Sequence, residues 1–178
     1  LKVLASKLNL NVSEDAIGKA ETVSFVEQAG RQIDVIKQHG RLGDMIVVAK
    51  PERDRNLGHN TLKAALFHSG RPVLMCPPTP ISLKKLGVKV TIAWNGSSEA
   101  ARALSQCKSV LRAADTVWIL SNGADSGPGT STSDLIYYLD LHGISARLEK
   151  FTSSKNIGKE LLIASTNLGA DMMIMGAY

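Results

Sequence analysis

Short apolar runs alternate along this chain with stretches in which apolar residues recur every three or four positions. The short runs predict strands at 44–49, 71–76, 88–93, 116–120 and 172–175, and alternation of apolar and polar residues predicts strands at 22–27 and 144–151. Helical spacing predicts helices at 33–39, 61–68, 98–114, 133–141 and 157–168, and residues 1–10 have the pattern of a helix tail followed by a loop. Alternating strands and helices indicate an α/β fold, a Rossmann-like parallel sheet flanked by helices.

The stretch from Val88 to Leu104 carries the strongest local signal. A β-branched run ends at Ala93, Asn95-Gly96 interrupts it, and Ser97 is suited to cap the helix that follows. Ligands of open α/β sheets bind at the carboxyl ends of strands, and helix amino ends attract anions such as phosphate. The turn therefore predicts a nucleotide contact, with one alternative: Asn and Gly also suit a turn because both tolerate positive φ.

An internal repeat divides the chain. Residues 42–49 resemble residues 168–176, and pairing Asp44 with Asp171 gives an offset of 127. On that offset the first copy lacks its opening strand, helix and second strand. We therefore expect a chain truncated at both ends, with the back of one domain at 1–80, a linker at 81–87 and a second domain at 88–178 that lacks its last helix and strand.

Three segments resemble the universal stress protein family. Residues 92–100 are similar to the opening of such a domain, residues 169–178 to its fourth strand, and residues 40–78, with Gly-Arg-Pro-Val-Leu at 70–74, to its end. For a tandem protein of two such domains, the resemblance extends over nearly the whole chain. The resemblance implies a five-stranded parallel sheet, a stress-response role, adenine-nucleotide binding in some members, and dimers or tandem pseudo-dimers.

The resemblance also implies where a nucleotide would bind. Nucleotide-binding members have an Asp after the first strand, where this chain has Asn95, and a G-x2-G-x9-G-[ST] loop after the fourth strand, whose first glycine matches Gly176. Gly176 also fits a plain strand end, and the rest of that loop would follow Tyr178. In the first copy Ala49 takes the glycine position, so we expect no ATP binding there. The implied ATP or AMP site comprises Ala93, Asn95, Gly96, Met175 and Gly176.

The charge and composition of the chain argue against some classes of binding partner. The net charge of +5 is dispersed and aromatic residues make up only 4% of the chain, so no nucleic-acid surface is expected. No apolar run is long enough for a membrane span, and no signal peptide is evident. Cys76 and Cys107 lack CxxC spacing and histidine partners, which favours reduced thiols and a cytoplasmic location.

The sequence gives little support for metal binding, dinucleotide binding or acid–base catalysis. The histidines have no ligand spacing for a metal, residues 123–129 are not a dinucleotide fingerprint and favour a surface loop, and no pair of carboxylates follows a strand. We therefore expect no catalytic residue and no metal. Together with the role that the resemblance implies, this gives a non-enzymatic stress-response protein. The alternatives left open are a ligand-free assembly module and, less favoured, a nucleotide hydrolase.

Overall fold

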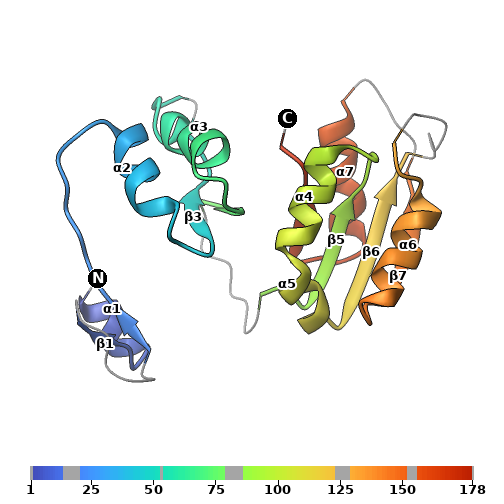
Figure 1. Ribbon diagram of the computed structural model, residues 1–178, viewed down its shortest axis with the longest axis horizontal. Coiled ribbons are helices and arrows are strands. Elements are labelled where there is room, and N and C mark those ends of the chain that lie inside the picture. The colour runs from blue at the N-terminus through green and yellow to red at the C-terminus, as the bar shows by residue number, and fades with distance from the viewer. Residues whose placement is uncertain are drawn as a thin grey trace.

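The computed structural model describes residues 2–13, 21–52, 54–78, 86–122, 129–151 and 156–177, so most of the expected linker 81–87 and of the loop 123–129 lies outside the described residues. Figure 1 shows the elements. In chain order they are α1 (Lys2–Lys7), β1 (Asn11–Val12), β2 (Thr22–Val23), α2 (Gln32–Gly40), β3 (Ile46–Ala49), α3 (His59–His68), β4 (Val73–Cys76), β5 (Lys89–Ala93), α4 (Ser98–Gln106), α5 (Lys108–Ala113), β6 (Thr116–Ser121), α6 (Thr132–Leu141), β7 (Ala146–Lys150), α7 (Ile157–Asn167) and β8 (Met172–Met175).

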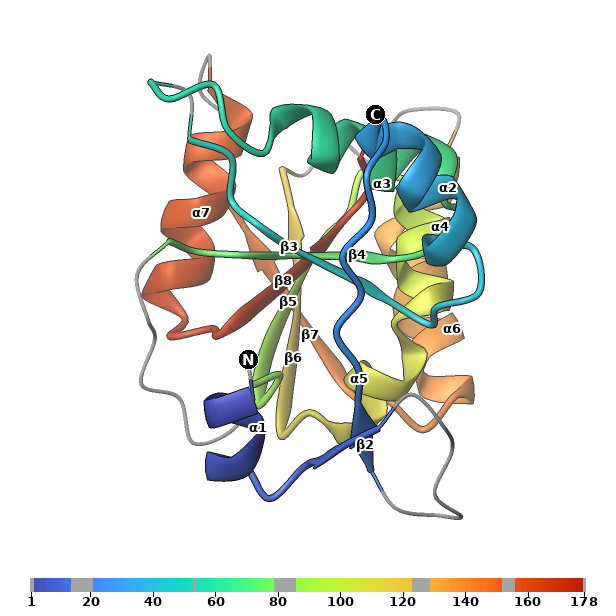
Figure 2. The ribbon, with the colours of Figure 1, turned by 90° about the vertical axis from the view of Figure 1, so that its left-hand side faces the viewer.

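Residues 86–177 form a four-stranded sheet in the order β7-β6-β5-β8. All three strand pairs are parallel, and Ile92 of β5 lies in register with Ile119 of β6 and Ile174 of β8. Helices α4, α5 and α6 cover one face of this sheet and α7 covers the other (Figure 2). The prediction of an α/β fold with a parallel sheet flanked by helices is confirmed.

The central strand β5 is buried on both faces, as its continuous apolar run predicts. Val90 and Ile92 belong to a core cluster with residues of α4 to α6, among them Leu104, Leu111 and Leu135. On the opposite face Thr91 is fully buried, and its hydroxyl lies 2.8 Å from the Ser165 hydroxyl of α7. The buried polar side chain of this strand is thus hydrogen-bonded to the helix that covers it.

The predicted helix 98–114 is wrong in one respect, because it is two helices. α4 ends at Gln106, the φ of −102° and ψ of 13° at Cys107 leave the helical region, and α5 begins directly after Cys107. The amino end of α4 is as predicted: the Ser97 hydroxyl accepts the Ala100 amide proton at 3.2 Å. The apolar stripe continues through the break because Leu104 and Leu111 both reach the same core.

Residues 2–78 are organised differently. They contain two separate two-stranded parallel sheets, β1-β2 and β3-β4, with α2 and α3 packed against each other. The predicted strand 22–27 is shorter than expected and ends at Val23, and its partner β1 was not predicted. In both sheets, the sequence pattern of one strand does not indicate which other strand it pairs with.

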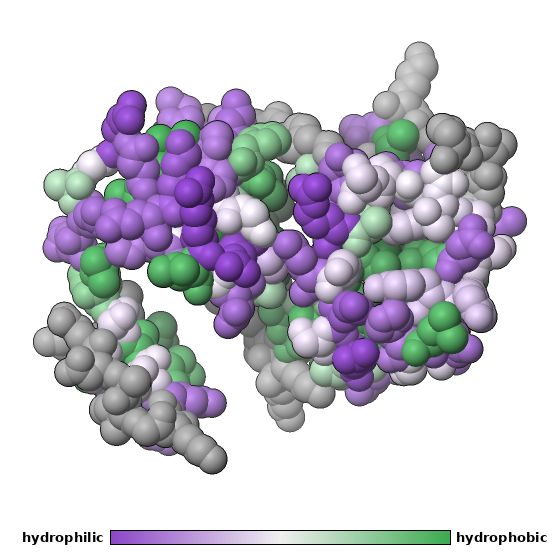
Figure 3. All heavy atoms as spheres, in the orientation of Figure 1, coloured by the Kyte–Doolittle hydropathy of each residue, from purple (hydrophilic) through white to green (hydrophobic). Residues whose placement is uncertain are grey.

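The described part of residues 2–78 has little core. Its buried apolar residues are Ala5, Val48, Ala64 and Ala65, and α2 has no buried residue. Larger apolar side chains are exposed instead, including Phe25, Val26 and Val47, each more than 60% exposed, and green apolar patches reach the surface of this part of the molecule (Figure 3). A sheet of two strands cannot enclose a core, so these side chains stay in solvent.

The strands β3 and β8 are related by an offset one position smaller than the one that pairs Asp44 with Asp171. β3 begins at Ile46 and β8 at Met172, 126 positions later, and at this offset the buried Val48 corresponds to the buried Ile174. Each strand follows a helix, α2 or α7, whereas the wider organisation into two repeats stays a prediction.

Candidate functional site

The strand order reverses between β5 and β8. From β5 the chain builds β6 and β7 on one side and then returns to add β8 on the other. Such a reversal is where open α/β sheets bind ligands, beyond the carboxyl ends of the two strands. Ala93 and Met175 lie opposite each other in register at that point, the former half-buried and the latter 54% exposed. These two predicted site residues are thus adjacent.

The turn after β5 is held by its own side chains. Asn95 Oδ1 accepts the Ser97 amide proton at 3.1 Å, and Gly96 adopts a φ of +72°. A Cβ on Gly96 would lie 2.9 Å from the Thr130 carbonyl oxygen, the same atom to which Trp94 Nε1 donates at 3.1 Å. Both features require glycine at this position. The turn geometry that the sequence left as an alternative is therefore present.

Gly176 lies directly against the first turn of α4. A Cβ built on Gly176 would come within 2.6 Å of the Ala100 amide nitrogen, so only glycine allows this approach. The chain beyond β8 consequently runs beside the amino end of α4, as the C-terminal label in Figure 1 indicates. Gly176 and the Asn95-Gly96 turn approach the same helix end, so the structure gathers the five predicted site residues at one edge of the sheet.

Glu99 supplies a negative charge to this helix end. Ser98 Oγ donates to Glu99 Oε1 at 2.9 Å. The pKa of Glu99 is lowered chiefly by its own backbone amide and next by the Ser98 hydroxyl; Ser97 and Arg102 act in the same direction, and burial opposes them. The α4 amino end therefore already carries its own carboxylate.

We expect Glu99 to titrate below the ordinary glutamate pKa of 4.5. Because the pKa of Glu99 is lower in the folded than in the unfolded protein, its ionised carboxylate stabilises the folded protein at pH values above 4.5. This stabilisation is lost as the pH falls through the pKa of Glu99 in the folded protein. Carbon-detected NMR of the Glu99 carboxyl between pH 2 and 7 measures the midpoint. Ser98→Ala is expected to move the midpoint upward, and a midpoint at or above 4.5 in the unmodified chain would contradict the arrangement.

Asp171 has a structural role at the opposite end of β5, which the sequence analysis missed. Its carboxylate accepts amide protons from Gly87, Val88 and Lys89 at 3.0, 3.1 and 3.3 Å, and its own amide donates to the Lys89 carbonyl at 2.9 Å. These bonds fix the start of β5 against the start of β8. An acidic residue immediately before a buried strand was the available signal.

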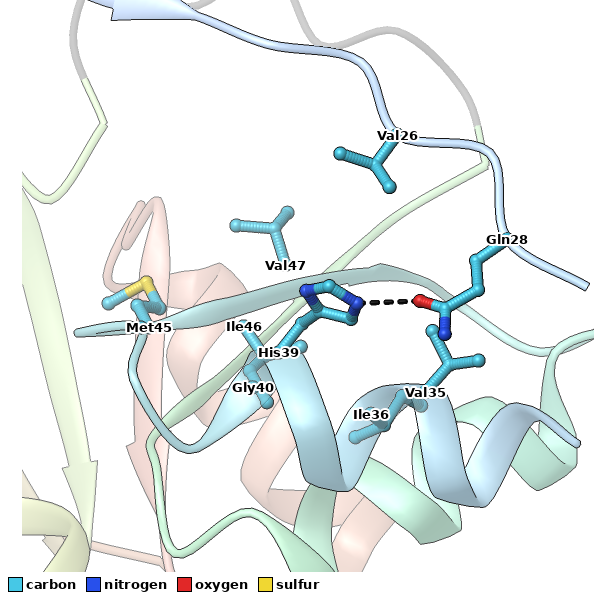
Figure 4. A pocket seen from close by; sticks show the side chains of 10 residues that line it. Val26, Gln28, Val35, Ile36, His39, Gly40, Met45, Ile46 and Val47 are labelled. Carbon is cyan, nitrogen blue, oxygen red and sulfur yellow. Dashed lines mark hydrogen bonds between the residues drawn. The ribbon is translucent and has the colours of Figure 1, made fainter. Parts of the chain in front are cut away.

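A hollow of about 500 Å³ lies in the other part of the chain and was also not predicted. It is lined by α2, the start of β3 and the extended segment before α2, with Val35, Ile36 and Val47 among its apolar residues. His39 Nε2 lies 2.7 Å from Gln28 Oε1 at its margin (Figure 4). The hollow contains none of the predicted site residues.

The residues that the structure describes offer little for metal binding or thiol chemistry. They include no group of three or more His, Cys, Asp or Glu side chains that could hold a metal ion. Both cysteines are free, and burial raises the pKa of the Cys107 thiol, which disfavours its reactive thiolate form. No helix in the same described segments is long and apolar enough to cross a membrane.

No protein-family model and no curated protein matches this chain.

Proposed function

We propose that this chain is a tandem protein of the universal stress protein type, in which residues 88–178 bind an adenine nucleotide weakly. The motifs at 92–100, 169–178 and 40–78 support the family assignment. The matching helix–strand units α2–β3 and α7–β8 support the tandem organisation. On this proposal the two copies act as a pseudo-dimer or as part of a homo-oligomer in a stress response.

One observation carries the nucleotide proposal: Ala93 and Met175 meet in register where the strand order reverses. Asn95, Gly96 and Gly176 border the same α4 amino end. An adenine base or ribose would lie beyond Ala93 and Met175, with hydrogen bonds from the Asn95 side-chain amide. Phosphate groups would lie toward the first-turn amides of α4.

The local hydrogen bonds favour weak rather than tight binding. Ser97 Oγ already accepts from the Ala100 amide, and Asn95 Oδ1 already accepts from the Ser97 amide. The Glu99 carboxylate lies at the same helix end and repels a phosphate. Asn95 carries no charge with which to hold a metal bound to the phosphates.

The proposal includes no catalytic step. Ala93, Asn95, Gly96, Met175 and Gly176 carry no side chain that could serve as a nucleophile or a general base. Binding would then act as recognition of the nucleotide. The free thiols of Cys76 and Cys107 are consistent with the cytoplasmic location that we propose for the protein.

Calorimetry of the full chain with ATP and with AMP tests the nucleotide proposal. We expect a dissociation constant below about 1 mM, which corresponds to about −4.1 kcal/mol. Glu99→Gln is expected to tighten ATP binding about two- to fivefold, because it removes a like charge from the phosphate end of the site. Glu160→Gln is the matched control, since it removes the same charge from the first turn of α7.

Millimolar or absent affinity in the full chain would remove the nucleotide role and leave the fold unaffected. Equal effects of Glu99→Gln and Glu160→Gln would mean that net charge, rather than the α4 amino end, controls binding. A ligand-free assembly protein is the second candidate, favoured by the exposed apolar side chains of residues 2–78. Nucleotide that copurifies with the chain would argue against it.

A further inference from the structure

One edge of β3 has no strand beside it among the residues that the structure describes. In the described segments β3 pairs with β4 alone. The amides of Ile46 and Lys50 donate to the Pro72 and Cys76 carbonyls on that side, at 3.0 and 2.8 Å. Backbone groups alternate along a strand, so the amides of Val47 and Ala49 point to the opposite, open edge.

The hollow of about 500 Å³ lies on this open side. Met45, Ile46 and Val47 line it from β3 and the residue before it, and none of its lining residues belongs to β4. Val35 and Ile36 of α2 line it from the helix, and Val26 lies across from Val47 (Figure 4). The space beside the open edge is therefore mostly apolar and bounded on several sides.

The sheet of residues 86–177 shows how an equivalent edge is filled. At the offset of 126, Val47 and Ala49 correspond to Met173 and Met175 of β8. These residues lie on the β8 edge that pairs in parallel with β5, opposite Thr91 and Ala93. In that body the equivalent space is occupied by a strand whose residues Val90 and Ile92 are buried.

We propose that the open edge of β3 binds an extended polypeptide strand that runs parallel to β3, with apolar side chains directed into the hollow. A row of exposed amide and carbonyl groups is matched most completely by another polypeptide backbone. The apolar lining selects uncharged, β-branched or aliphatic residues at the positions that enter the hollow. This occupant would also cover Val26 and Val47, which are 66% and 61% exposed. The inference is independent of the nucleotide proposal.

The test adds a synthetic peptide to the full chain. The peptide has the sequence of residues 86–94, which contains β5, the strand that pairs with the equivalent edge of β8. Hydrogen exchange at the Val47 and Ala49 amides, resolved by NMR, is expected to slow about tenfold at a peptide concentration of about ten times its Kd. The same peptide with Thr91→Pro and Ala93→Pro is expected to give no protection, because backbone groups of these residues face β8 in the parent sheet and proline removes their amide donors.

A pair of variants locates the binding. Val47→Asp puts a charge into the hollow and is expected to abolish the protection at Ala49, whereas Val3→Asp, at an equally exposed valine of α1, is expected to preserve it. Three results would overturn the proposal: unchanged exchange with the peptide, equal protection by the proline peptide, or loss of protection with Val3→Asp. Protection without peptide that rises with protein concentration would identify a second copy as the occupant and would also overturn it.

Discussion

Replacing Ile92 with alanine is expected to lower the free energy of unfolding of the 86–177 body by about 2–5 kcal/mol. Ile92 is 1% exposed and lies in the central strand, in register with Ile119 and Ile174. Its truncation leaves a cavity between β5 and the helices that neighbouring side chains can fill only in part. Urea denaturation followed by tryptophan fluorescence measures this loss, because both tryptophans, Trp94 and Trp118, belong to this body.

Ile157→Ala is the control for that prediction. It removes the same atoms from the first residue of α7, where the side chain is 50% exposed, and is expected to change the free energy of unfolding by less than about 0.5 kcal/mol. Similar losses for the two variants would contradict the assignment of Ile92 to the core of the sheet.

Gly96→Ala is expected to destabilise the same body by about 2–4 kcal/mol, from two sources. An alanine at a φ of +72° is strained, and its Cβ would come within 2.9 Å of the Thr130 carbonyl oxygen. The Asn95-Gly96 turn would then move away from residues 129–130 and from the amino end of α4. The same urea denaturation measures the change.

Gly143→Ala separates the two sources. Gly143 has a φ of +71°, close to that of Gly96, but a Cβ there would meet no atom within 4 Å. Its replacement is therefore expected to cost only the backbone strain, about 1–2 kcal/mol. If the two glycine variants lose the same stability, the contact between Gly96 and Thr130 contributes nothing.

The pattern of apolar and polar residues predicted the strands and helices of residues 86–177 well. Each strand from β5 to β8 was expected within two residues of its observed bounds. β5, β6 and β8 follow short apolar runs, as buried parallel strands do, and the edge strand β7 follows an alternating pattern. The break between α4 and α5 escaped detection because the apolar stripe does not change at Cys107. Helical spacing records which residues face the core, and it is unaffected by a local change in backbone angles at one residue.

The first part of the chain was harder to predict. The β1-β2 pairing joins residues ten positions or more apart through backbone bonds that carry no side-chain pattern. The sequence aligns Asp44 with Asp171, whereas burial aligns Val48 with Ile174, at an offset one position smaller. A shift of one residue exchanges the two edges and the two faces of a strand, so the offset determines which residues of β8 correspond to the open edge of β3.

The candidate site was predicted as a set of residues but not as a geometry. Local patterns identified Asn95, Gly96 and Gly176, yet the approach of Gly176 to the Ala100 amide depends on the pairing of β8 with β5. The Glu99 carboxylate at the α4 amino end could be anticipated from its place in the first turn. The hollow beside β3 could not be anticipated, because it depends on how α2, β3 and the segment before α2 pack against one another.

The proposed nucleotide site beyond β5 and β8 is tested most directly by amide NMR of the full chain during titration with AMP. The account predicts saturable shifts concentrated at Asn95, Gly96, Ser97 and Gly176, with small changes at His39 and Val47 beside the hollow. Shifts centred on the hollow, or no saturable shift at several millimolar AMP, would contradict it.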